Sequence, residues 1–127
     1  MLAGLVSSAG DARPAKRSPV CTRGLVTVEI DPRGLLPLTA NAVGPSATAA
    51  LRYTQIRAKP QVVRADLATV DHERGGEAKF ECGSRVWRRT VVVYITLRAF
   101  EKSASLSEKV FFAGRFRDGY RVWQVVH

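Results

Sequence analysis

The stretch VFFAGRFRDGYRVWQVV, residues 110–126, decides the fold of this chain. Residues 110–116 and 120–126 are rich in the β-branched and aromatic side chains that favour strands, and Asp118-Gly119 lies between them. A two-residue primed turn needs positive φ, which this dipeptide adopts easily. The pattern therefore predicts a β-hairpin at the end of the sequence.

The pairing across this hairpin decides which side chains share a face. With Arg117 opposite Tyr120, Trp123 lies opposite Gly114, and we expect its indole to fill the gap that the glycine leaves. Both faces are apolar at the base of the hairpin, and its tip is basic. A sheet that is apolar on both faces packs on a helix on one side and on another element or a partner on the other.

The preceding sequence predicts two more strands and one substantial helix. Residues 25–30 read as a short strand, and residues 85–100 read as a long core strand with alternate apolar side chains on one face. The helix is expected to begin at Pro45 or Ser46 and to stop before Pro60. Its small alanines suit close packing on a sheet.

The middle of the chain is less clearly patterned. Residues 61–71 fit either a strand or a continuation of the helix, and both alternatives stay open. The segments 72–76 and 83–84 predict turns on either side of 77–82, because they contain glycine among polar residues. The order of elements predicts an α+β fold, in which one main helix packs on a curved antiparallel β-meander.

Residues 1–24 have the composition of an extended, irregular basic arm, and residues 25–127 that of a single α+β domain. The arm does not resemble a secretory signal, because its basic residues follow the short apolar stretch 2–6. It fits either an organelle transit segment or an arm that crosses a neighbouring subunit. We therefore favour a mitochondrial matrix or cytoplasmic location over secretion. The basic residues of the arm are Arg13, Lys16, Arg17 and Arg23.

The charge of the chain favours anionic partners. It has 20 basic and 11 acidic residues, a formal net charge of +9. Guanidinium groups bind phosphate and aromatic rings stack on exposed bases, so two basic clusters suit RNA, although they also suit an acidic protein or anionic lipid. An alternative role is to keep sheet edges from aggregating. The first basic cluster is Arg85, Trp87, Arg88 and Arg89; the second basic cluster is Arg115, Arg117, Tyr120 and Arg121.

The two cysteines, Cys21 and Cys82, have neither the spacing of a zinc site nor that of a redox motif. Cys82 is expected to be a small buried residue, and a disulfide between the two is the alternative in an oxidising compartment. We predict no metal and no cofactor. No apolar run approaches the roughly 20 residues of a membrane-spanning helix.

One helix followed by an antiparallel meander, with the ending Gly119-Tyr120-Arg121-Val122-Trp123, resembles the cystatin-like and NTF2-like group of α+β folds. The resemblance covers residues 45–127 and implies that the helix lies in the curve of the sheet. Cystatin inhibitors use a Gln-x-Val-x-Gly loop. The segment 61–65 has the Gln and a Val but not the Gly, so protease inhibition is not expected.

Residues suited to catalysis are few. His127 ends the sequence and His72 lies in a polar turn, where Asp71, His72 and Glu73 read as a solvated turn rather than a metal or acid-base cluster. We therefore predict that the protein is not an enzyme. The alternative is an NTF2-like cone that binds or turns over a small molecule, with Asp66 beside Tyr94 and Thr96.

The net charge, the basic arm and the lack of a catalytic set together predict a non-catalytic structural or accessory subunit. It would dock in a larger assembly, a ribonucleoprotein or an organellar complex, through its basic surface and arm. The expected partners are other protein subunits, with RNA and anionic lipid as alternatives.

Overall fold

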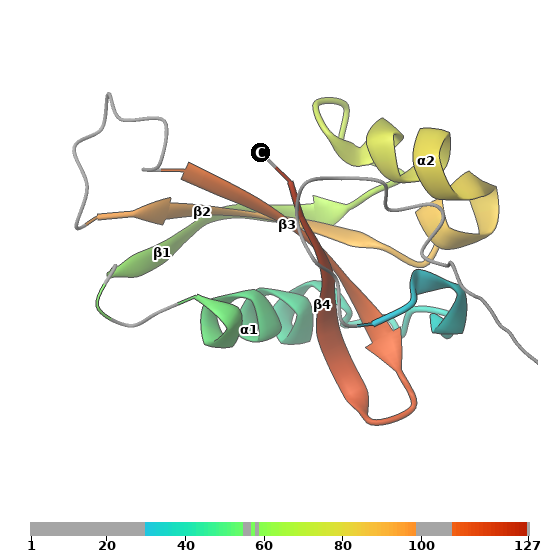
Figure 1. The fold of residues 1–127 in the computed structure, drawn as a ribbon, viewed down its shortest axis with the longest axis horizontal. Helices are drawn as coiled ribbons and strands as arrows, with labels where there is room; N and C mark the ends of the chain where they lie inside the picture. The colour runs from blue at the N-terminus through green and yellow to red at the C-terminus, as the bar shows by residue number, and fades with distance from the viewer. Residues whose placement is uncertain (1–29, 55–56, 58, 99–107, 127) are drawn as a thin grey trace, which may run out of the picture.

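The computed structural model describes residues 30–54, 57, 59–98 and 108–126. These residues form two α-helices and a four-stranded antiparallel sheet of order β1-β2-β3-β4, which is a meander (Figure 1). The predicted α+β class is confirmed. The elements are a 3-10 helix, η2 (Pro32–Gly34), the α-helices α1 (Val43–Tyr53) and α2 (Gly75–Trp87), and the strands β1 (Pro60–Leu67), β2 (Val91–Leu97), β3 (Glu108–Phe116) and β4 (Gly119–Val126).

Helix α1 packs on one face of the sheet, as predicted (Figure 1). It begins at Val43, slightly before the expected start, and ends at Tyr53 because Thr54 is extended, with φ −87° and ψ 142°. Its buried residues are Ser46 and Ala50, whose small side chains let the helix lie close to the sheet. The alternate apolar residues of β2 predicted to share a face do face α1: Val91, Val93, Ile95 and Leu97.

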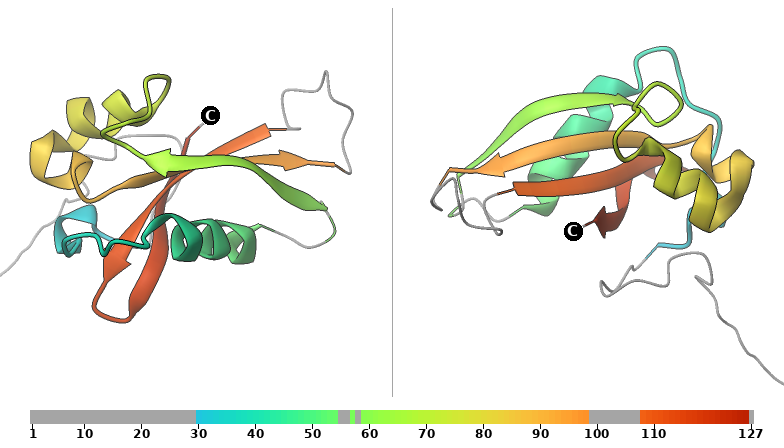
Figure 2. Two further views of the ribbon diagram at one scale, coloured as in Figure 1. Left: turned by 180° about the vertical axis from the view of Figure 1, so that it is seen from behind. Right: turned by 90° about the horizontal axis from the view of Figure 1, so that it is seen from above.

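Helix α2 lies against the opposite face, so both faces of the sheet are covered (Figure 2). Ala78 and Val86 of α2 are buried in one apolar cluster with Val92, Phe112 and Trp123 of the sheet. Because the sheet has one apolar cluster on each face, odd- and even-numbered residues of β2 and β3 alike are apolar.

The presence of α2 corrects the prediction for residues 72–87. The turn predicted at 72–76 is present as a bend at residues 72–74, but Gly75 and Gly76 already belong to α2. Gly83, with φ 88° and ψ 171°, is not helical and interrupts α2 with a kink where a turn was predicted at 83–84. The strand predicted to start at 85 is wrong, because α2 runs to Trp87 and β2 begins only at Val91. The prediction of α1 as the only substantial helix is therefore also wrong.

Asp71 explains how α2 begins after a glycine-rich turn. Its Oδ1 atom accepts hydrogen bonds from the backbone N–H groups of Glu73, Arg74 and Gly75, at 2.9, 2.7 and 3.1 Å. N–H groups at the start of a helix have no partner within the helix, so this carboxylate supplies one. Residue 71 is only 9% exposed, so the expectation of a solvated turn is wrong for Asp71, whereas His72 and Glu73 are exposed as expected.

The terminal hairpin is present, but its turn lies one residue earlier than predicted, so the pairing near the tip is shifted by two residues. Phe116 pairs with Gly119, so the turn residues are Arg117 and Asp118, and only Gly119 has positive φ, at 120°. This is the pattern of a turn followed by a glycine in a bulge, which the same dipeptide can also support. Gly114 consequently pairs with Arg121 and not with Trp123.

The gap at Gly114 is filled by other groups. A Cβ atom there would meet the side chain of Leu35 and would lie 2.6 Å from the carbonyl oxygen of Arg89. An irregularity between the Phe112 and Ala113 pairs shifts the register near Trp123, whose ring lies 5.3 Å from that of Phe112 between centroids. Burial of Trp123, at 1% exposed, is confirmed, although its expected neighbour is wrong.

The segment 61–71 is strand up to Leu67, which settles the alternative that the sequence left open. The arm and most of the predicted strand 25–30 lie outside the described residues. Cys82 is disulfide-bonded and so is not a free thiol. The only other cysteine of the chain, Cys21, lies outside the described residues, so its pairing with Cys82 stays a prediction. No helix in the described part of the chain is long and apolar enough to cross a bilayer.

Candidate partner-binding groove at strand β4

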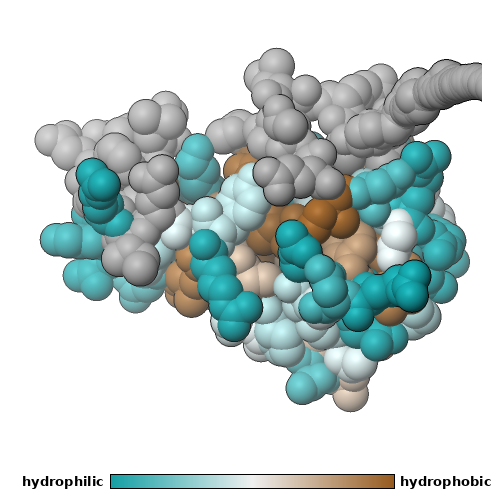
Figure 3. All heavy atoms as spheres, turned by 60° about the horizontal axis from the view of Figure 1, so that its bottom comes forward, coloured by the Kyte–Doolittle hydropathy of each residue, from teal (hydrophilic) through white to brown (hydrophobic). Residues whose placement is uncertain are grey.

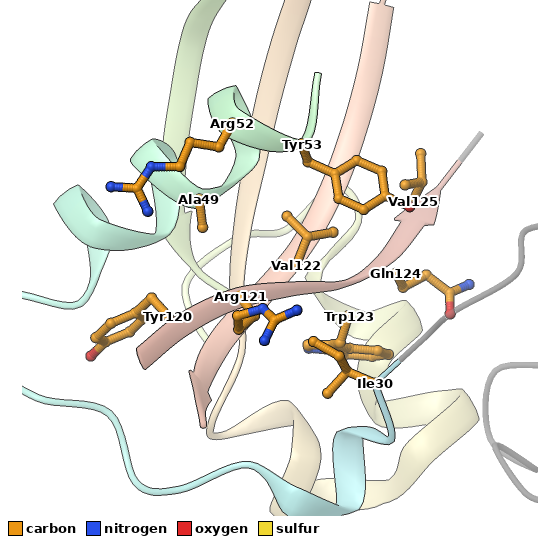
Figure 4. A pocket seen from close by; sticks show the side chains of 10 residues that line it. All are labelled: Ile30, Ala49, Arg52, Tyr53, Tyr120, Arg121, Val122, Trp123, Gln124 and Val125. Atoms are coloured by element: carbon orange, nitrogen blue, oxygen red, sulfur yellow. The ribbon is translucent and has the colours of Figure 1, made fainter. Parts of the chain in front are cut away.

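A hollow of about 230 Å³ runs along β4, which is an edge strand of the sheet. We call it the β4 groove. Six consecutive residues of β4 line it, together with three residues from the second half of α1 and Ile30, which lies two residues before η2 (Figure 4). Its lining residues are Ile30, Ala49, Arg52, Tyr53, Tyr120, Arg121, Val122, Trp123, Gln124 and Val125.

The β4 groove has an apolar floor between two different walls. Tyr53 and Arg52 of α1 lie on one side of β4, and Ile30 lies on the other side next to Trp123 (Figure 4). The ring of Tyr53 meets that of Phe111 edge-to-face at 5.8 Å, which fixes the α1 wall against β3. Figure 3 shows one face of the molecule on which apolar surface is bordered by hydrophilic side chains.

Two polar side-chain atoms of β4 are buried and have no hydrogen-bond partner among the described residues. They are Nε1 of Trp123 and Oε1 of Gln124, one donor and one acceptor on neighbouring lining residues. A buried polar group without a partner costs about 1–3 kcal/mol, so such groups are rare in folded domains.

The rim of the groove is basic. Arg52 is exposed and forms no ion pair with another described residue. Arg121 forms a 2.6 Å ion pair with Asp118, but its side chain is 46% exposed, so both ions remain in contact with water. Exposed ion pairs contribute little stability, so Arg121 can exchange this partner for another carboxylate.

Some residues of each predicted basic cluster form hydrogen bonds within the protein itself. Segment 33–39 crosses the end of the sheet, and its backbone carbonyl groups accept hydrogen bonds from Arg85, Arg89 and Arg115, at 3.0, 2.8 and 2.9 Å. The hydroxyl of Tyr120 lies 2.7 Å from that of Thr39. The two clusters therefore meet on one segment, where these four residues hold a loop.

Other members of the clusters remain at the surface. Trp87 lies under the ammonium group of Lys79, 4.5 Å from the ring centroid. Arg88 and Arg117 are exposed and form no ion pair with another described residue. The prediction that the clusters bind RNA or an acidic partner stays a prediction, with only some of its residues free to do so.

The residues of the predicted cone pocket lie on the other side of the molecule. Tyr94 and Thr96 line an open depression of about 290 Å³ with Arg64, but Asp66 is not among its lining residues. The carboxylate beside Tyr94 is that of Asp71, which accepts a hydrogen bond from the tyrosine hydroxyl at 3.1 Å. The guanidinium of Arg64 lies over the ring of Tyr94, 4.1 Å from its centroid.

This arrangement shifts the acidities of the pair in opposite directions. Burial alone would raise the pKa of Asp71, but the backbone N–H of Arg74, the hydroxyl of Tyr94 and the N–H groups of Gly75 and Glu73 outweigh it, so the pKa of Asp71 is lowered. Burial, and then the hydrogen bond to Asp71, raise the pKa of Tyr94 to about 12. A carboxylate with a lowered pKa is a weak base, so the pair is suited to structural support.

The described residues contain no group of three or more His, Cys, Asp or Glu side chains that could hold a metal ion. His72 is exposed, and His127 lies outside the described residues. Comparison of the chain with protein-family models, with curated proteins and with solved structures finds no match. The resemblance to cystatin-like and NTF2-like folds therefore stays an expectation.

The sequence prediction missed most of the β4 groove. Tyr120 and Arg121 are its only lining residues among those predicted to bind a partner. Arg52 and Tyr53 gave no signal, because they lie at the exposed end of a helix where charged and aromatic residues are common. Trp123 was predicted as a core residue and Gln124 only as a member of a strand, and only the sheet order identifies that strand as an edge.

Proposed function

We propose that this protein is a non-catalytic accessory subunit, which docks to another protein of a larger assembly through the β4 groove and the basic surface around it. The observation that carries this proposal is the open β4 groove itself, an apolar hollow with a basic rim along an edge strand of the sheet. An edge strand beside an apolar hollow is a surface to which another chain can bind.

A protein partner fits the β4 groove better than RNA does. The floor of the groove is aliphatic at Val122 and Val125, whereas RNA-binding surfaces present stacking rings and several arginines free for phosphate. Arg89 and Arg115 are engaged in contacts with the backbone of the chain itself. The remaining rim charges suit a partner with acidic side chains.

Site-specific photocross-linking in the native host tests this proposal. A benzophenone amino acid replaces Gln124 in the groove, and in a matched control it replaces Val70, which is 52% exposed and is not a groove residue. We expect one protein product that recurs at position 124, is absent at position 70 and survives nuclease treatment.

Two results would contradict the proposal. The same set of products at both positions would mean that contact at the groove is non-specific. Loss of the position-124 product after nuclease treatment, together with a steep fall of RNA affinity with salt, would favour the ribonucleoprotein alternative with RNA itself as the partner.

A further inference from the structure

We infer that the partner contributes an extended, acidic segment that pairs, as a fifth strand, with the outer edge of β4, which no described residue occupies. This inference rests on the proposed function and specifies the kind of partner segment. The β4 groove is long enough for it, because six strand residues at about 3.3 Å each span roughly 20 Å. A partner segment of five to seven residues would fill this length.

The backbone of β4 is oriented to pair on its outer side. The carbonyl of Arg115 accepts a hydrogen bond from the N–H of Leu36, at 2.7 Å, and so points away from β4. In an antiparallel pair, opposite residues turn their backbone groups the same way, either toward each other or apart. Tyr120, which pairs with Arg115, therefore directs its N–H and C=O outward. Alternation along the strand places the backbone groups of Val122 outward as well.

No described residue pairs with this outer edge of β4. A free edge of several residues is a template for another strand, and proteins usually cover it or place charges along it. Here the side chains of Val122 and Val125 face α1, and both are only 8% exposed. The edge thus presents backbone groups beside an apolar groove.

The arginine side chains beside the groove favour a partner segment with acidic side chains. The side chains of Arg52 and Arg121 lie on opposite sides of β4, so carboxylates on either face of an added strand would find an arginine (Figure 4). Charge-assisted hydrogen bonds to arginine are the strongest that such a surface offers. The net charge of +9 adds long-range attraction for the same kind of segment.

The test uses the full-length chain and a synthetic eight-residue peptide of alternating glutamate and valine, blocked at both ends. Its affinity is measured by fluorescence anisotropy, and the exchange rates of the β4 amides are measured by NMR. We expect saturable binding, with amide exchange at Val122 slowed about tenfold or more when the peptide is bound.

Two control peptides separate backbone pairing from charge. Methylation of every peptide nitrogen leaves the side chains and charges in place, and we expect it to weaken binding about a hundredfold, because several strand hydrogen bonds are lost. Replacement of glutamate by lysine leaves the backbone in place and should weaken binding about tenfold or more.

Two matched variants locate the contact on the hairpin. Arg121→Glu changes a groove residue, and Arg117→Glu makes the same change of charge at the exposed turn, outside the groove. We expect about a tenfold loss of affinity for Arg121→Glu and less than about a twofold change for Arg117→Glu. Equal losses for the two variants would mean that net charge alone attracts the peptide.

Each remaining outcome bears on a different statement. Equal binding of the N-methylated peptide, with a cross-linked partner found at Gln124, would overturn strand addition and leave the docking function in place. Slow amide exchange at Val122 without peptide, together with a concentration-dependent dimer, would show that a second copy covers the edge and would overturn the inference. Absence of both peptide binding and cross-linking at Gln124 would overturn the inference and the proposed function together.

Discussion

Replacement of Asp71 should show that one carboxylate fastens α2 to the sheet. Its Oδ1 atom accepts hydrogen bonds from three backbone N–H groups at the start of α2 and one from the hydroxyl of Tyr94 on β2. Asp71→Ala removes all four bonds. Asp71→Asn keeps a side-chain oxygen that can accept them but removes the negative charge.

The magnitudes follow from these contacts. Loss of a side chain that caps a helix costs about 0.5–2 kcal/mol, and a hydrogen bond to a charged group contributes about 1.5–3 kcal/mol. Because Tyr94 is partly exposed and water can replace its bond, we expect Asp71→Ala to lower the free energy of unfolding by about 2–3 kcal/mol. Asparagine is also a good capping residue, so Asp71→Asn should cost about 1 kcal/mol.

The effect of Asp71→Asn should depend on pH. The pKa of Asp71 is lowered in the folded protein from its ordinary value of 3.8. The stability that its charge contributes is therefore fully present above the unfolded pKa and is lost as the pH falls through the folded pKa. The difference between the original protein and Asp71→Asn should be largest near pH 7 and should shrink below pH 3.8, where the aspartate becomes protonated.

Urea unfolding at pH 7 and at pH 3, followed by circular dichroism, measures these differences. Asp66→Asn is the matched control, because Asp66 lies five residues earlier, on β1, and its side chain forms no hydrogen bond with another described residue. It should change the free energy of unfolding by less than about 0.5 kcal/mol. If Asp71→Ala were no more destabilising than Asp66→Asn, the role of Asp71 in starting α2 would be refuted.

Two further predictions concern packing. Gly75→Ala should lower the free energy of unfolding by about 1–3 kcal/mol, because the added Cβ meets the backbone carbonyl of Ala68; Gly76→Ala, with open space at its Cβ, should instead raise it by about 0.5–1 kcal/mol. If thermal melts or chevron plots ranked the stabilities of these two variants in the opposite order, the position of α2 against Ala68 would be shown to be wrong. Trp123→Ala should lower the free energy of unfolding by about 3–5 kcal/mol, because the indole is only 1% exposed and packs against Phe112. An unchanged melting temperature would contradict that burial.

The sequence was sufficient for the fold class but not for α2. Paired glycines and polar residues at 72–76, and Gly83-Ser84 further on, are typical of turns, and they suggested two turns around an extended segment. The helix forms because Asp71 holds the bend before it and accepts a hydrogen bond from the N–H of Gly75, its first residue, and because Ala78 and Val86 bury against the sheet. Both contacts depend on tertiary structure, which overrides local preference.

The register of the hairpin could not be predicted for a different reason. Asp118-Gly119 fits a two-residue primed turn, and it fits equally a turn in which only the glycine has positive φ. The two choices shift the pairing near the tip by two residues, and this changes the partner of Gly114 from Trp123 to Arg121. The position of Trp123 in the core was robust to this shift, whereas the β4 groove depends on the order of strands, which local pattern does not contain.

A meander has two edge strands, so the choice of β4 over β1 as the docking edge needs a physical reason. β1 begins with Pro60, which has no backbone N–H, and carries the charged residues Arg64 and Asp66 along its length. The outer side of β4 instead lies beside the valines at 122 and 125, in a groove. Each edge strand has a register irregularity, so bulges do not distinguish them. An extended partner therefore meets fewer obstacles at β4, and a partner of β1 would have to bind mainly through side chains.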